Sequence, residues 1–234
     1  MKLSTRLVLA TCLTAFGCSS TQTPPPAQAP VQTPPPEPAP APVATPEPTP
    51  EPTPAPPPAP EPFRASDADR AAWRNATTVL DYNARANFGG GTLRTGFTPD
   101  PWGFRLSAGG GRNPVDVASL NIRDAVSGDA CGRSFVTRRP DFHFTFAAGT
   151  SFPTLRFYVV TENSADATLL INDPNTEWRC NDDHHHEGWG NPLMPAIDFH
   201  NPPAGRYDIW VGTFDSSRGN PAQLFVTELE ANHP

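Results

Sequence analysis

Lysine is almost absent from this chain: Lys2 is the only one, and arginine supplies the other positive charges. The 234 residues carry 17 Lys and Arg against 24 Asp and Glu, which gives a formal net charge of −7. Nucleic-acid-binding domains normally present a basic field, so this balance argues against such a partner. The sequence also lacks any run of 18 apolar residues, and we therefore expect no membrane-spanning helix.

Proline is abundant but unevenly placed. Twenty of the 32 prolines fall between residues 19 and 62, in repeats of Thr-Pro, Glu-Pro, Ala-Pro and Pro-Pro-Pro. Proline fixes φ and lacks an N–H donor, so this segment favours polyproline II and reaches roughly 130 Å when extended. We expect a disordered spacer, followed from residue 63 by a region long enough to bury a sizeable core.

The N-terminus resembles a bacterial lipoprotein signal peptide. Positive residues precede the short apolar run of residues 7–16, and Gly17 then precedes Cys18. The resemblance implies cleavage after residue 17 and acylation of Cys18, whose acyl chains would anchor the protein in a membrane. Ser19 follows, which by analogy with enterobacterial sorting predicts the outer membrane. An ordinary secretory peptide cut after Gly17 is the alternative.

Beyond the spacer, apolar and polar residues alternate with the period of β-strands. Phe142, Phe144 and Phe146 share one face of such a strand. Short strands separated by Gly, Pro and Asn turns, without intervening helices, predict an all-β fold, either a β-sandwich or a jelly roll. The same alternation recurs in residues 155–159, 169–171, 197–199, 207–211 and 224–226, and weaker strands are expected near residues 92–97, 103–107, 115–120 and 133–137.

One helix is expected before the strands. Ser66 and Asp69 have the spacing of a capping box, which predicts a helix over residues 67–74. Thr77, Thr78 and Val79 favour β structure, so this helix should be short or absent. The predicted organisation is a signal peptide at 1–17, a lipidated cysteine and linker at 18–62, a lead-in at 63–91 and the β-sandwich domain at 92–234.

Two cysteines remain in the region expected to fold, Cys131 and Cys180. An exported chain with a pair of cysteines beyond its anchor predicts a disulfide, although two buried thiols would also fit. A metal-binding pair is disfavoured because neither cysteine belongs to a Cys-x-x-Cys unit.

Residues 166–183, which end in Cys-Asn-Asp-Asp, resemble the core of bacterial pre-peptidase C-terminal domains. Residues 204–212 continue that pattern with Gly-x-Tyr-x-Ile-Trp-Val-Gly, and the resemblance covers roughly residues 92–229. The His-His-His-Glu run at 184–187 departs from it. The resemblance implies a β-sandwich without catalysis of its own, which accompanies secreted hydrolases or stands alone on cell surfaces. Such domains sometimes hold calcium and bind polymers such as collagen.

A calcium site is the first candidate function of the loop after Cys180. Asp182 and Asp183 supply carboxylates, the resemblance brings in Asp166, and Asn191 can add an amide oxygen. Calcium takes six to eight oxygen ligands of these kinds. Asp and Asn are also ordinary turn residues, so a metal-free turn is the alternative.

Histidine and tryptophan give two further candidate sites. His184 and His186 could converge on a transition metal with a third ligand, and otherwise they are solvated loop residues. Trp189 and Trp178 are candidate contacts for a sugar or peptide ligand, because aromatic rings form binding platforms.

No hydrolase signature is present. The chain lacks Gly-x-Ser-x-Gly, His-Glu-x-x-His and a phosphate loop. We therefore expect no enzyme, but an envelope lipoprotein that presents a binding module to a matrix polymer, the cell wall or a protein partner. One alternative is an accessory structural subunit of an envelope machine, and a second is an unrecognised secreted hydrolase.

Overall fold

The computed structural model describes the part of the chain that follows the proline-rich linker. The predicted signal peptide, Cys18 and the linker up to residue 60 lie outside the described residues. Among the described residues, every helix is too short or too polar to cross a membrane. The described residues are 61–149, 151–162, 165–215 and 218–234.

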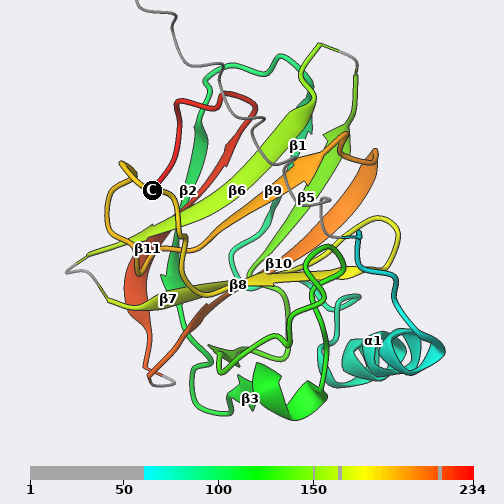
Figure 1. Cartoon of the computed structure of the whole chain (residues 1–234). Helices are drawn as coiled ribbons and strands as arrows, with labels where there is room; N and C mark the ends of the chain where they lie inside the picture. The colour runs from blue at the N-terminus through cyan, green and yellow to red at the C-terminus, as the bar shows by residue number, and fades with distance from the viewer. Residues whose placement is uncertain (1–60, 150, 163–164, 216–217) are drawn as a thin grey trace, which may run out of the picture. The chain divides into compact units, whose positions relative to one another are not determined.

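Two β-sheets form a sandwich, which confirms the predicted all-β class (Figure 1). The first, seven-stranded sheet contains β1 (Gly90–Arg94), β3 (Val115–Asp116), β4 (Phe135–Val136), β5 (Phe142–Ala147), β7 (Ala167–Asn172), β8 (Trp178–Asn181) and β10 (Gly205–Thr213). The second sheet contains β2 (Trp102–Ala108), β6 (Thr154–Thr161), β9 (Ala196–His200) and β11 (Asn220–Thr227).

Strand order places two edge strands on the same side of the sandwich. The first sheet runs β1-β5-β10-β4-β3, and β7 lies between β10 and β8. The second sheet runs β2-β11-β6-β9. Side chains of β8 reach the backbone of β9: Asn181 Oδ1 accepts from Ala196 N at 2.9 Å, and Arg179 Nη1 donates to Asp198 O at 3.3 Å. The edges β8 and β9 therefore face each other.

The main core lies between the two sheets, where the alternating residues meet. Phe142, Phe144 and Phe146 are buried there, while the residues between them on β5 are partly or fully exposed. Phe144 meets Phe157 of β6 edge to face, with 5.5 Å between ring centroids. The period-two pattern of the sequence thus identified the inner faces of the strands.

A second core covers the outer face of the seven-stranded sheet. Helix α1 (Asp67–Val79) and the 3-10 helix η1 (Val117–Leu120) pack against this face. As a result β7 is buried at every position, because Ala167, Leu169 and Ile171 pack in the main core while Leu170 packs in the outer core. This second layer explains why β7 is buried on both faces, although the alternation of Leu169 and Ile171 predicted only one buried face.

Helix α1 is longer than predicted. Its capping box is confirmed, since Ser66 Oγ accepts from Asp69 N and the Asp69 carboxylate accepts from Ser66 N. The expectation that it would end near residue 74 is wrong, because the helix continues to Val79. The hydroxyls of Thr77 and Thr78 each donate to a carbonyl three residues earlier, and packing against the sheet offsets their weak helix propensity.

The strand predicted over residues 115–120 is also partly wrong. Only Val115–Asp116 is a strand, and a 3-10 helix follows. The Asp116 side chain accepts from Ala118 N at 3.1 Å, a local hydrogen bond that begins the helical turn. The helix buries Val117 and Leu120 in the outer core.

Candidate metal and ligand site

Three of the predicted calcium ligands meet at one end of the β7–β8 hairpin. These strands are antiparallel, with Leu169 opposite Asn181. Asp166 immediately precedes β7, and Asp182 and Asp183 immediately follow β8. The hairpin register therefore brings together carboxylates that are far apart in the sequence.

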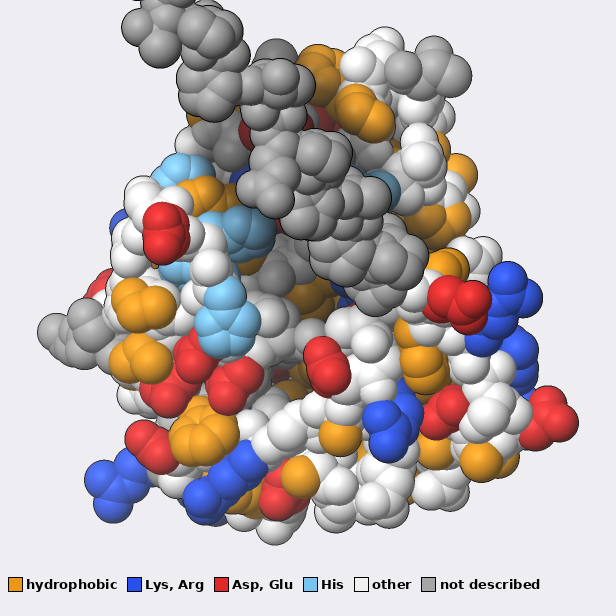
Figure 2. All heavy atoms as spheres, in the orientation of Figure 1, with side chains coloured by type: hydrophobic (Ala, Val, Ile, Leu, Met, Phe, Trp, Pro, Cys, Tyr) orange, Lys and Arg blue, Asp and Glu red, His pale blue; other side chains and the backbone are white. Residues whose placement is uncertain are grey.

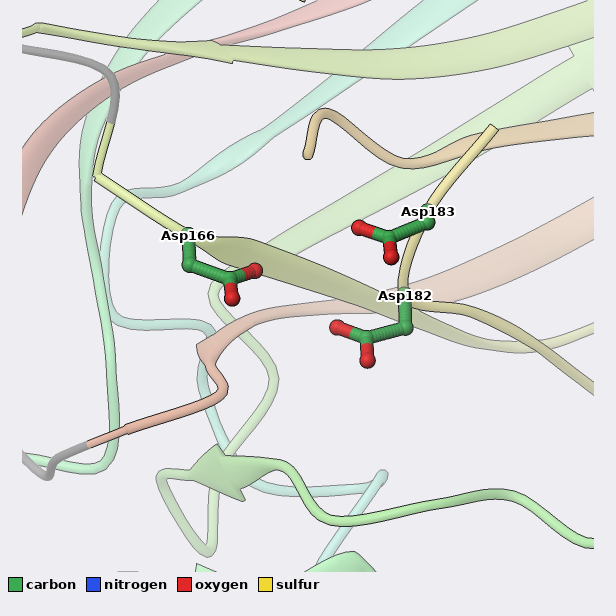
Figure 3. Close-up of side chains that lie close together, drawn as sticks. All are labelled: Asp166, Asp182 and Asp183. Atoms are coloured by element: carbon green, nitrogen blue, oxygen red, sulfur yellow. The ribbon is translucent and has the colours of Figure 1, made fainter. Parts of the chain in front are cut away.

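The three carboxylates converge (Figure 3). One oxygen from each lies within 4.8 Å of the others, and no other group of three His, Cys, Asp or Glu side chains among the described residues meets that distance. The Oδ1 atoms of Asp166, Asp182 and Asp183 are buried and have no hydrogen-bond partner among the described residues. A buried acceptor without a donor is costly, so a cation fits this position.

The electrostatics of the cluster follow from burial and like charge. Burial, and then the charges of Asp166, Asp183 and Asp215, raise the pKa of Asp182 to about 7. Burial also raises the pKa of Asp166, with contributions from Asp183 and Asp215. Asp215 follows β10, and the adjacent Phe214 N donates to Asp166 O at 3.3 Å. Sequence reasoning missed Asp215, because only sheet pairing brings β10 beside β7.

Asn191, the fourth predicted calcium ligand, is engaged within its own loop. Its Oδ1 accepts from Leu193 N at 3.1 Å, and its carbonyl accepts from His184 Nε2 at 2.9 Å. A role for Asn191 in binding calcium stays a prediction.

His184 and His186 lie in different surroundings. His184 is 4% exposed, and its buried Nδ1 has no hydrogen-bond partner in the described ranges. His186 is exposed and stacks on Trp189 at 4.0 Å between ring centroids. No triad of potential metal ligands within the described ranges includes a histidine. The structure therefore does not place the two imidazoles with a third ligand around one position.

Trp189, a predicted ligand contact, is half-buried in a stack of cationic and aromatic side chains. The Arg156 guanidinium lies 4.3 Å from its ring centroid, and the His233 ring is parallel to it at 4.9 Å. The neighbouring Gly190 N donates to Pro234 O at 2.9 Å. The C-terminal segment thus packs against the loop that carries His184–His186, near the end marked C in Figure 1.

The prediction that Trp178 contacts a ligand is wrong, because this side chain lies in the interior. It is 0% exposed and packs on Trp210, with 5.3 Å between ring centroids. Its indole N–H donates to Trp73 O of α1 at 3.2 Å. Helix α1 covers this part of β8, so Trp178 belongs to the outer core.

A groove of about 670 Å³ runs along the side of the sandwich where β8 and β9 face each other. Asp182, Asp183 and Trp189 line it, together with residues of the segment 124–134. Figure 2 shows acidic and histidine side chains gathered side by side on one hollowed face. The volume is within the range of ordinary ligand sites.

The predicted disulfide is present and forms part of this groove. Cys131 and Cys180 are bonded, with 5.7 Å between their Cα atoms, and both line the groove. Arg179 Nε donates to Asp124 Oδ2 at 2.9 Å beside the disulfide. Sequence reasoning missed Asp124 as a groove residue, since no motif links it to β8.

No protein-family model and no curated protein matches the sequence. Among solved structures, the chain is similar to the pre-peptidase C-terminal domain of a collagenase from Bacillus anthracis, at 13% identity and a TM-score of 0.32, over 59% of this chain and 94% of that chain. It is also similar to PliG of Aeromonas hydrophila, a periplasmic inhibitor of g-type lysozyme, at 14% identity and a TM-score of 0.25, over 59% of this chain and 96% of that chain. A third is CorA of Methylomicrobium album BG8, a surface-associated copper-binding protein, at 9% identity and a TM-score of 0.33, over 62% of this chain and 99% of that chain. The two-sheet architecture is consistent with the pre-peptidase C-terminal-like fold expected from the sequence, and we transfer no function from these three proteins.

Proposed function

We propose that this protein is a non-catalytic binding module, held at the outer membrane by a lipid on Cys18, whose ligand-binding end is stabilised by calcium. The observation that supports calcium is the convergence of the Asp166, Asp182 and Asp183 carboxylates, each of which has a buried oxygen without a hydrogen-bond partner among the described residues. The signal sequence and the proline-rich spacer support an anchored module displayed at a distance from the membrane.

The donor set favours a hard cation. Asp166, Asp182 and Asp183 offer only carboxylate oxygens, which suit calcium and magnesium better than zinc or copper. Calcium accepts irregular geometry and six to eight oxygens, so both oxygens of a carboxylate can serve. A bound divalent ion supplies positive charge that offsets the repulsion among these acids. The three side chains would then hold the end of β7 against the loop that follows β8.

The test is a thermal melt of the folded domain in chelator and in millimolar calcium. Ligand binding to the folded state alone should stabilise the wild type by about 2.7 kcal/mol at a hundredfold excess over Kd. Asp182→Asn should abolish most of that gain. Asp129→Asn is the matched control, because Asp129 is an exposed acid of the same groove outside the converging group. Equal wild-type melting temperatures in both buffers would remove calcium from the proposal.

A further inference from the structure

The groove beside the carboxylates is closed to strand addition by a peptide. On the β8 edge, Cys180 N donates to Asp124 Oδ2 at 3.0 Å, and Ala125 N donates to Trp178 O at 2.8 Å. The facing β9 edge is engaged by the Asn181 and Arg179 side chains described above. Peptides that add to a sheet need free main-chain groups on its edge. A ligand of this groove must therefore be recognised through side chains.

Two of the acids that line the groove are already neutralised. Asp124 accepts from Arg179 Nε at 2.9 Å. Asp198 accepts two hydrogen bonds from Arg156, at 2.6 and 2.8 Å. The other acids that line the groove, Asp129, Asp182 and Asp183, have no such partner in the described part of the chain. Without a cation, these acids would repel an anionic ligand.

Arg133 is the arginine of the groove without a carboxylate partner among the described residues. It is exposed, and its guanidinium lies 5.1 Å from the Phe135 ring centroid and 5.9 Å from that of Phe214. Phe214 N donates to Asp166 O, and Arg133 lines the same groove as Asp182 and Asp183. A guanidinium held by aromatic rings presents a planar fork of donors that matches a carboxylate.

We infer that the groove binds a carboxylated polysaccharide, with Arg133 recognising its carboxylates and calcium at the Asp166 cluster required for binding. This inference rests on the proposed calcium site. Asp182 and Asp183 line the groove. Coordination positions of the calcium ion that the protein leaves unfilled would therefore face the space where such a sugar would lie. The blocked strand edges favour a glycan over an acidic peptide, and the exposed His185 and His186 offer polar ring nitrogens in the same groove.

The test measures binding of hexagalacturonate by calorimetry, with cellohexaose as the uncharged reference. The wild type should bind hexagalacturonate in calcium and lose binding in chelator, and cellohexaose should bind at least about tenfold more weakly. Arg133→Ala should weaken hexagalacturonate binding about tenfold while the calcium-induced rise in melting temperature persists. Arg85→Ala is the matched control, because Arg85 is an exposed arginine outside the groove.

The possible contrary results distinguish failure of the polysaccharide inference from failure of the proposed calcium site. Hexagalacturonate binding that survives the chelator, or that Arg133→Ala leaves unchanged, would overturn the inference. Tighter binding of hexaglutamate than of hexagalacturonate would replace the glycan with an acidic peptide. If neither probe binds while calcium still raises the melting temperature, the inference fails and the proposed calcium site stands. If calcium leaves the melting temperature unchanged, the proposed site itself fails.

Discussion

Asp182 connects the stability of the domain to pH. Its pKa is raised from 3.8 to about 7 by burial and neighbouring acids, so the folded protein holds this proton more tightly than the unfolded chain. The favourable contribution is complete below the ordinary value of 3.8 and is lost as the pH rises through about 7. In chelator, we expect the free energy of unfolding to fall between these values. Calcium at the proposed site would favour the ionised carboxylates and should therefore reduce or reverse the fall.

Asp141 requires a comparison of variants, because burial raises its pKa to about 7 as well. The titration of Asp141 therefore also lowers the free energy of unfolding as the pH rises over the same range. Urea unfolding of wild type and Asp182→Asn in chelator, from pH 4 to pH 8, separates the two. The variant should lose less stability than the wild type over this interval. Parallel pH profiles would show that Asp182 does not titrate as described.

Individual residues show where sequence reasoning reaches its limit. Asp182 and Asp183 stand out because they are adjacent carboxylates after a cysteine, whereas Asp215 carries no such signal. Trp178 and Trp189 both read as aromatics near an acidic loop, yet one is buried and the other half-buried. The difference is set by helix α1, whose position over β8 depends on tertiary packing.

The capping box of α1 should have a measurable effect on stability. Ser66 Oγ accepts from Asp69 N at 3.2 Å, and the Asp69 carboxylate accepts from Ser66 N at 2.8 Å. Ser66→Ala removes the hydroxyl and should destabilise the domain by about 1 kcal/mol in urea unfolding. Arg74→Ala, on the exposed part of the same helix, is the control and should change stability by less than about 0.5 kcal/mol. Equal effects of both would argue against a stabilising cap.

The disulfide should matter more than the cap. Cys131 and Cys180 are 49 residues apart, a loop whose closure stabilises the folded state by about 4 kcal/mol on the chain-entropy model. The double variant Cys131→Ser, Cys180→Ser should lose a stabilisation of that order in equilibrium unfolding. Reduction of the wild type under the same conditions provides an independent measure. A loss below about 1 kcal/mol would show that the unfolded chain is little constrained by the bond.

At the level of elements, the sequence predicts what local chemistry determines. Alternation identified the inner residues of β5, such as Phe142 and Phe144, because this strand has one face on the main core. The same reasoning failed at Val117–Leu120, where a side-chain hydrogen bond begins a 3-10 helix instead. The same reasoning predicted a helix shorter than α1, because β-branched residues lower helix propensity but do not exclude a helix that packs on a sheet.

Anchoring belongs to the whole molecule and depends on Cys18. Acylation of this cysteine should keep the exported protein with the membrane fraction. We expect Cys18→Ala to move the protein to the soluble fraction after cell lysis. The Cys12→Ala variant is the control and should remain with membranes. Membrane retention of the Cys18 variant, without incorporation of labelled fatty acid in the wild type, would contradict a lipoprotein.

The sequence predicted the all-β domain and its disulfide but not the second layer or the groove. The groove forms because β8 and β9 are edges of different sheets on one side of the sandwich. Asp124, Arg133 and Asp215 come from three separate segments around it, and no short motif links them. Such a site depends on strand order, which hydrophobic alternation alone does not specify.

The contacts between α1 and β8 have a mechanical consequence. Trp178 donates to Trp73 O, and Trp73 donates to Arg123 O at 3.0 Å, so the helix is joined to the edge strand and to the residue that precedes Asp124 of the groove. A pulling force between the start of α1 and a ligand held in the groove has a short path through these contacts. The Cys131–Cys180 bond crosses the same region covalently. Tension along this path would largely bypass the four-stranded sheet.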